Sequence, residues 1–176
     1  LSGVGCPDLG SLLIMPTIGE LDVDYQHYGS RYTDEKATPG YYTNKLTKYD
    51  ILTEVTSTTR VGVHRYTFPK GQANILLNLG QGLTNETGAS VRFNGDNEVE
   101  GMKMLGTFCY NAQAVFPVYF VMRIAKTPVK SGLWKKQRPM EGVKSQWDKD
   151  QGKYKIYDGY QRDIAGDDVG AWFSFD

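Results

Sequence analysis

The chain has 176 residues, which is enough for one domain with a single buried core. Its 20 lysines and arginines balance its 20 aspartates and glutamates, and no apolar run approaches the roughly 20 residues of a membrane-spanning helix. We therefore expect neither nucleic acid nor a membrane as a partner. Two cysteines are too few for a disulfide framework or a structural zinc site. We expect Cys6 and Cys109 to be buried thiols, with a bridge between them as the open alternative.

The beginning of the chain carries strand-like runs rather than helical stripes. Residues 12–15 are continuously apolar and end at Pro16, which predicts a first strand. Residues 20–25 alternate acidic and apolar side chains. This alternation predicts a half-buried strand with Asp22 and Asp24 facing water.

The middle of the chain predicts several more strands. Residues 50–68 are rich in β-branched residues, and their second half places His64 and Tyr66 on one face. Residues 73–79 form another apolar run. The segment SVRFNGDNEVEGMKML, residues 90–105, predicts a hairpin that turns at NGDN.

The last third of the chain mixes strands with a long polar stretch. Residues 118–125 are apolar at both odd and even positions, so we expect a central strand covered on both faces. Residues 127–150 are dominated by Lys, Gly and Gln, and predict a surface excursion. Residues 153–164 predict a hairpin turning at Asp158 and Gly159, and residues 169–175 predict a final alternating strand.

Strands joined largely by hairpins, without helices between them, are typical of antiparallel sheets packed face to face. We therefore predict an all-β fold, a two-sheet antiparallel β-sandwich that occupies residues 1–176. Alternation within the strand-like runs assigns eight side chains to the core: Ile75, Leu77, Leu79, Phe120, Met122, Ile124, Phe173 and Phe175.

Few residues are suited to catalysis or metal binding. Only two histidines are present, which excludes a three-histidine zinc site, and His64 within a strand is favoured as a structural residue. The neighbouring carboxylates Asp167–Asp168 and Asp34–Glu35 point to opposite faces if they lie on strands, so they make poor catalytic pairs. The three tryptophans, Trp134, Trp147 and Trp172, are candidates for stacking on sugar rings, although Trp172 is favoured as a core residue.

Four segments, taken in order, resemble the N-terminal domain of the glycoside hydrolase family 92 α-mannosidases. They are LSGVGCPDLGSLLIMP, DEKATPGYY, EVTSTTRVGVHRYTFP and ANILLNLG. The similarity runs from Leu1 to about Leu79 and continues more loosely through VEGMKMLGTFCY and FPVYFVMRI. The resemblance implies an inverting, calcium-dependent, exo-acting mannosidase, in which a β-sandwich docks on an (α/α) barrel and the active site lies in the cleft between them.

The same resemblance limits what this chain is expected to do. The acid, the base and most calcium ligands of such enzymes belong to the barrel, so the resemblance assigns no catalytic or metal-binding residue here. It predicts a partial domain, cut inside the sandwich at both ends, that is inactive and free of cofactors on its own. It further implies mannose-containing glycans and the barrel as partners, and a periplasmic or secreted location. Sheet edges left exposed in such a fragment predict self-association.

The resemblance also suggests where substrate is contacted. It implies that the SGVGC stretch, with Ser2, Gly3, Gly5 and Cys6, continues the segment that approaches the sugar, and glycines allow a backbone to come close to a ligand. A tight turn that feeds the strand at Leu12 is the alternative. We expect a non-catalytic wall of a mannosidase cleft; the alternatives are a self-sufficient carbohydrate-binding β-sandwich module and a scaffold that contacts no sugar.

Overall fold

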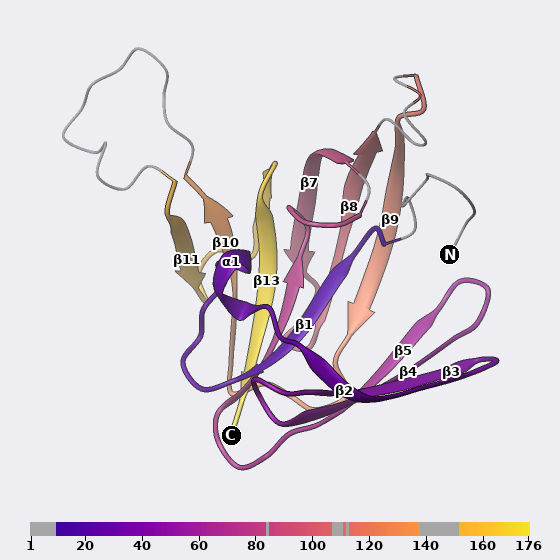
Figure 1. The fold of residues 1–176 in the computed structure, drawn as a ribbon. Helices are drawn as coiled ribbons and strands as arrows, with labels where there is room; N and C mark the ends of the chain where they lie inside the picture. Colours follow the sequence, from indigo (N-terminus) through magenta and orange to yellow (C-terminus); the bar gives the residue numbers. More distant parts are fainter. Residues whose placement is uncertain (1–9, 84, 107–110, 112, 138–151) are drawn as a thin grey trace.

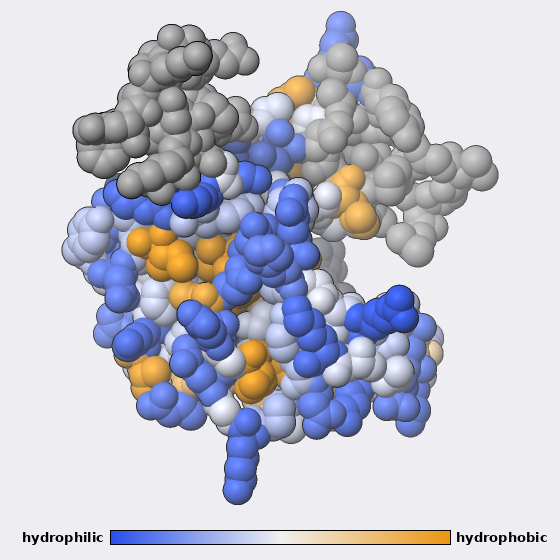
Figure 2. Space-filling model, turned by 60° about the vertical axis from the view of Figure 1, so that its left-hand side comes forward, coloured by the Kyte–Doolittle hydropathy of each residue, from blue (hydrophilic) through white to orange (hydrophobic). Residues whose placement is uncertain are grey.

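The computed structural model describes residues 10–83, 85–106, 111, 113–137 and 152–176. Within these ranges the chain forms three antiparallel sheets and one four-residue helix, which confirms the predicted all-β fold. Two of the sheets pack face to face, and the third lies across their lower end (Figure 1). On the face shown in Figure 2, hydrophobic side chains form small separate patches among hydrophilic ones.

The five-stranded sheet has the order β1-β6-β13-β10-β11. It consists of β1 (Leu13–Ile18), β6 (Ala73–Asn78), β13 (Val169–Phe175), β10 (Lys130–Lys136) and β11 (Tyr154–Asp158). Every residue of β6 and β13 is buried, because this part of the sheet is covered on both faces. One cover is the second sheet, and the other is the segment that contains the helix α1 (Tyr25–Tyr28).

The facing sheet, which is the second layer of the sandwich, has the order β12-β7-β8-β9. It consists of β12 (Asp163–Gly166), β7 (Asn85–Phe93), β8 (Glu98–Gly106) and β9 (Phe116–Arg123). The strands β7 and β8 form the predicted hairpin, which Asn94 closes by donating its backbone N–H to the carbonyl of Glu98.

The main core lies between these two sheets and confirms the predicted alternation. Six of the eight predicted core residues are buried there, and Phe120 and Met122 pack against it half-buried. The rings of Phe93 and Phe173 meet edge to face across the two layers, with their centroids 5.6 Å apart. A second cluster, on the other side of the five-stranded sheet, contains Val23 and Tyr28.

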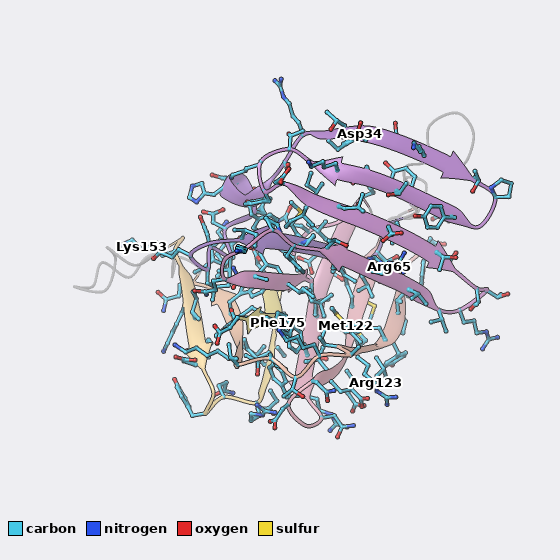
Figure 3. All side chains as sticks on the ribbon, turned by 90° about the horizontal axis from the view of Figure 1, so that it is seen from below. Asp34, Arg65, Met122, Arg123, Lys153 and Phe175 are labelled. Carbon is cyan, nitrogen blue, oxygen red and sulfur yellow. The ribbon has the colours of Figure 1, made fainter. Side chains whose placement is uncertain are left out.

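The meander sheet is the third layer, with strands β2 (Tyr32–Thr38), β3 (Tyr41–Leu46), β4 (Ile51–Ser57) and β5 (Gly62–Thr67) paired in sequence order. Seen from below, its strands run across the sandwich, with Asp34 and Arg65 on them (Figure 3). The two segments predicted within residues 50–68 are β4 and β5, and the His64 and Tyr66 side chains share a face as expected, with Nδ1 and the hydroxyl 2.7 Å apart.

The predicted surface excursion over residues 127–150 is wrong for residues 130–136. These residues form β10, which lies between β13 and β11 and is hydrogen-bonded to both. Leu133 and Trp134 are fully buried, on opposite faces of the sheet. Two large apolar side chains are enough to bury this strand, because glycines and the neighbouring strands complete the packing around it. The lysine-rich composition therefore wrongly indicated a surface loop. Residues 138–150 lie outside the described residues.

The predicted hairpin over residues 153–164 is also wrong. The strands β11 and β12 belong to different sheets, so the turn at Gly159, where φ is +79°, carries the chain from one layer of the sandwich to the other. Two apolar strands around a turn signal predict pairing, but only the position of their partners, β10 and β7, decides between a hairpin and a crossover.

Two further strand predictions need correction. Val23 is buried as expected, but Tyr25, predicted on the same side, is exposed, and residues 20–24 form a loop that leads into α1. Asp24 caps this helix by accepting the Gln26 N–H at 3.0 Å. The strand β9, predicted to be central and covered on both faces, is the last strand of its sheet, and Tyr119 is exposed on its outer side.

Candidate functional site at the strand ends

The predicted substrate-binding residues Ser2, Gly3, Gly5 and Cys6 lie outside the described residues, as does Cys109. Their prediction therefore stays a prediction. The nearest described residue is Gly10, whose carbonyl accepts the Leu83 backbone N–H at 3.2 Å.

Gly10 also packs tightly against the turn that follows β6. A Cβ atom at Gly82 would lie 2.8 Å from the Gly10 carbonyl oxygen and 3.0 Å from Lys103 Nζ. The first described residues thus enter the sandwich beside a polar group of side chains. We call this group the strand-end cluster, and it comprises Tyr28, Asn78, Glu86, Lys103, Tyr154 and Asp168.

Asp168 precedes β13, a strand that runs from the upper end of the sandwich to the C-terminus at the lower end (Figure 1). The Tyr154 hydroxyl donates a hydrogen bond of 2.8 Å to Asp168 Oδ2, and Lys136 Nζ lies 3.9 Å from the same oxygen. Burial, followed by the hydrogen bond to Asp168, raises the pKa of Tyr154. A Cβ at Gly80 would fall 2.4 Å from Asp168 Oδ1, so only glycine permits this approach.

A second hydrogen-bonded chain lies beside Asp168. Asn78, the last residue of β6, donates from Nδ2 to the Tyr28 hydroxyl at 2.7 Å and accepts the Gly80 N–H on Oδ1 at 2.9 Å. Burial raises the pKa of Tyr28 to about 12. Because the Tyr28 and Tyr154 hydroxyls both stay protonated through neutral pH, they act as hydrogen-bonding groups and not as bases.

Lys103 is the charged member of the cluster on the facing sheet. Its side chain is fully buried and its ammonium group donates to the Gln81 carbonyl at 2.8 Å. Burial lowers the pKa of Lys103, and the nearby Glu86 carboxylate opposes that effect. Burial likewise raises the pKa of Glu86. The Lys103 ammonium is hydrogen-bonded to a backbone carbonyl and lies in the field of the partly buried Glu86 carboxylate, and both effects make its burial tolerable.

The strand-end cluster therefore offers hydroxyl, amide, ammonium and carboxylate groups at one end of the sandwich. Tyr28, Asn78 and Lys103 are buried, so their hydrogen bonds hold the strand ends and the adjoining turn in place beside Gly10. Sequence reasoning singled out Asp167 and Asp168 but missed Tyr154, Asn78 and Lys103. Their convergence depends on strand register across two sheets, for which the sequence holds no local signal.

Three other acidic residues named from the sequence, Asp22, Asp34 and Glu35, belong to the local structure around them. Asp22 Oδ1 accepts the Asp24 N–H at 2.9 Å, and Asp22 Oδ2 lies 3.0 Å from His27 Nδ1. Asp34 sits at a bulge of β2 with φ +54°, and Glu35 accepts the Tyr42 hydroxyl at 2.8 Å. The Asp22 carboxylate is thus engaged in the loop before α1, and the Glu35 carboxylate joins β2 to β3.

Two of the three tryptophans considered as sugar platforms are unavailable for that role. Trp134 and Trp172 are buried in the second cluster, the latter as favoured from the sequence. Trp147 lies outside the described residues. Among the residues that the structure describes, no group of three or more His, Cys, Asp or Glu side chains is placed to hold a metal ion, and no helix is long and apolar enough to cross a membrane.

Comparison with known families gives a match along the whole chain. The sequence profile described as the glycosyl hydrolase family 92 N-terminal domain matches residues 1–176. A search of curated proteins finds no match.

Solved structures similar to this chain include a family GH92 α-mannosidase from Bacteroides thetaiotaomicron. In its complex with mannoimidazole the TM-score is 0.77 at 26% identity, and in a second structure of the same enzyme the TM-score is 0.78 at 27% identity. Each comparison covers 100% of this chain but 23% of the mannosidase. A third structure, the GH92 family glycosyl hydrolase CcMan5, has a TM-score of 0.67 at 24% identity, with 100% and 22% of the two chains covered, and shows the shared fold.

Proposed function

Because this chain belongs to the glycosyl hydrolase family 92 N-terminal domains, we propose that it is the non-catalytic N-terminal part of an exo-α-mannosidase. In this role it forms one wall of the substrate cleft and docks on an (α/α) barrel. The observation that carries the proposal is the match along all 176 residues, together with the similar α-mannosidase structure, of which this chain spans 23%. Mannose-containing glycans are the proposed substrates, and a periplasmic or secreted location is proposed with them.

The proposed reaction is calcium-dependent hydrolysis with inversion. An inverting glycosidase needs an acid and a base roughly 6.5–9.5 Å apart with a water molecule between them. The family resemblance places the acid and the base in the barrel, and within the described ranges no group of three or more His, Cys, Asp or Glu side chains is placed to hold a metal ion. We therefore assign the acid, the base and the calcium ligands to parts of the polypeptide outside the described residues of this chain.

The proposed wall is the start of the chain, which the strand-end cluster supports. The cluster lies beside Gly10, and the predicted segment from Ser2 to Cys6 comes shortly before Gly10 in the sequence. Groups on such a wall hold and desolvate a sugar, and these effects accelerate hydrolysis only when the reacting carboxyls are held opposite.

The first test is hydrolysis of an activated aryl α-mannoside with and without calcium. We expect no release of the aryl group above buffer from this chain alone, and turnover from a longer polypeptide in which the chain precedes a helical barrel. Loss of a general acid or base forfeits roughly 10²–10⁴ in rate for each. Turnover by this chain alone that disappears in Asp168→Asn would instead make it an autonomous glycosidase.

A second test separates a cleft wall from a scaffold. In the longer polypeptide we expect Gly3→Ala and Gly5→Ala to lower kcat/KM, since an added methyl group displaces a backbone that approaches the sugar. Unchanged kcat/KM in both variants would support the scaffold alternative.

A further inference from the structure

We propose that the outer face of the facing sheet is a binding surface for an uncharged oligosaccharide. This outer face is the side of β12, β7, β8 and β9 that points away from the five-stranded sheet. The residues that carry the argument are Arg92, Glu100, Met102, Tyr119, Val121 and Asp163. They line an open depression of about 910 Å³ on this face of the sheet.

Strand register aligns these side chains in two rows across the four strands. Ala165 pairs with Ser90, Ser90 with Met102, and Met102 with Tyr119. The neighbouring row runs from Asp163 through Arg92 and Glu100 to Val121. Since Val91 and Val99, on the alternate positions, are in the core, both rows face outward. One row is therefore small, apolar and aromatic, and the next is largely charged.

The apolar row ends in an exposed aromatic ring. The exposed fraction of Tyr119 is 76%, and that of Val121, beside it on the same strand, is 62%. The inner side of β9 already supplies Phe120 and Met122 to the core, so the fold does not require apolar side chains at the outward positions. Large apolar residues left open on the last strand of a sheet indicate a surface that is covered by a ligand or partner.

The charged row favours an uncharged, polyhydroxylated ligand. Arg92 donates from Nε to Glu100 Oε1 at 2.6 Å, so these two charges neutralise each other. An anionic ligand would have to compete with Glu100 for Arg92 and would also meet the Asp163 carboxylate, whereas sugar hydroxyls can donate to the remaining carboxylate lone pairs and accept from the remaining guanidinium N–H groups. The Tyr119 ring provides the flat apolar surface on which the C–H face of a sugar ring packs.

The choice of a saccharide rests on the family of the chain, since a domain of glycoside hydrolases works among glycans. It does not depend on the proposed cleft wall, which lies at the strand ends. Binding beside the strand-end cluster alone would agree with the proposed function and overturn this inference, so the two can fail separately.

The test is an NMR titration of the ¹⁵N-labelled chain with α-1,2-, α-1,3- and α-1,6-linked mannotrioses, each up to about 10 mM. We expect at least one trisaccharide to give saturable shifts of the amides of β7, β8, β9 and β12. We expect Tyr119→Ala to weaken that binding about ten-fold or more, which corresponds to about 1.4 kcal/mol, and Tyr119→Phe to retain it because the ring remains.

The matched control is Tyr32→Ala, which removes an aromatic ring of 53% exposure from the meander sheet and is expected to leave binding unchanged. Thermal unfolding of each variant checks that the fold is retained. The inference is overturned if none of the three trisaccharides shifts these amides, or if Tyr119→Ala binds as well as the unaltered chain. It is also overturned if sedimentation shows a dimer that Tyr119→Ala dissociates, because the face would then bind a second copy.

Discussion

Trp134 packs directly over Gly170, its cross-strand partner, so closely that a Cβ on Gly170 would lie 2.1 Å from the indole ring. The next pair on the same face of the sheet has the same arrangement with the strands exchanged. There Trp172 lies over Gly132, and a Cβ on Gly132 would be 2.9 Å from the indole ring. The two large rings thus occupy the space that two glycines leave open on one face of the five-stranded sheet. The arrangement explains how β10 is a buried strand with so few apolar residues.

We expect Gly170→Ala to lower the free energy of unfolding by about 1–3 kcal/mol, since the new methyl group overlaps the Trp134 ring in a close-packed core. Denaturant unfolding measures this change. The matched control is Gly29→Ala, where a Cβ meets no atom within 4 Å. Equal stabilities of the two variants would contradict the packing described here.

The hydroxyl of Tyr154 provides a second prediction. It reaches across β10 to Asp168, so it links β11 to the start of β13. We expect Tyr154→Phe to lower the free energy of unfolding by about 1.5 kcal/mol. This value is the lower end of the usual net contribution of a hydrogen bond to a charged group. Tyr157→Phe, on the same strand, is the comparison. If both variants lose the same stability in urea, the Tyr154 hydroxyl has no special role.

The lowered pKa of Lys103 predicts that the stability of the fold depends on pH in the alkaline range. Burial holds its pKa below the usual 10.5 in the folded chain, so the unfolded chain binds more protons between the folded pKa and 10.5. The stability due to this lysine therefore rises with pH across that window, by about 1.4 kcal/mol for each unit of pKa shift. We expect the unaltered chain to gain stability relative to Lys103→Met as the pH is raised from 8 to 10.5. A difference between the two that is constant with pH would refute the lowered pKa.

The lowered pKa of Glu54 predicts a pH dependence of stability in acid. It accepts hydrogen bonds from Arg65 Nε at 2.6 Å and from the Tyr41 hydroxyl at 2.6 Å. The hydrogen bonds from Arg65 and then Tyr41 hold the pKa of Glu54 at about 2, below the usual 4.5. A carboxylate with a lowered folded pKa stabilises the fold above the unfolded value, and that contribution is lost as the pH falls from 4.5 towards 2.

We therefore expect Glu54→Gln to be less stable than the unaltered chain at pH 6, with the difference shrinking as the pH is lowered to 3. Urea unfolding at both pH values provides the measurement, and Glu20→Gln, in an exposed loop, is the control variant. A Glu54→Gln difference that stays the same at both pH values would argue against the role of the Arg65 and Tyr41 contacts.

The sequence by itself determined the class of fold, the strands with clear alternation and the family. Alternation is a local property, since successive side chains of a strand point to opposite faces, and it placed Ile75, Leu77 and Phe173 in the core. Consecutive motifs between Leu1 and Leu79 were enough to indicate the family that the profile match shows.

Only the tertiary structure decided which strands are neighbours and which faces are covered. The crossover at Gly159, the burial of β10 and the open outer side of β9 all depend on partners distant in the sequence. The strand-end cluster has the same origin, since Tyr154 and Asp168 meet across β10 through the register of three strands. Pairing partners and register are settled by the packing of whole layers, which the local order of residues does not encode.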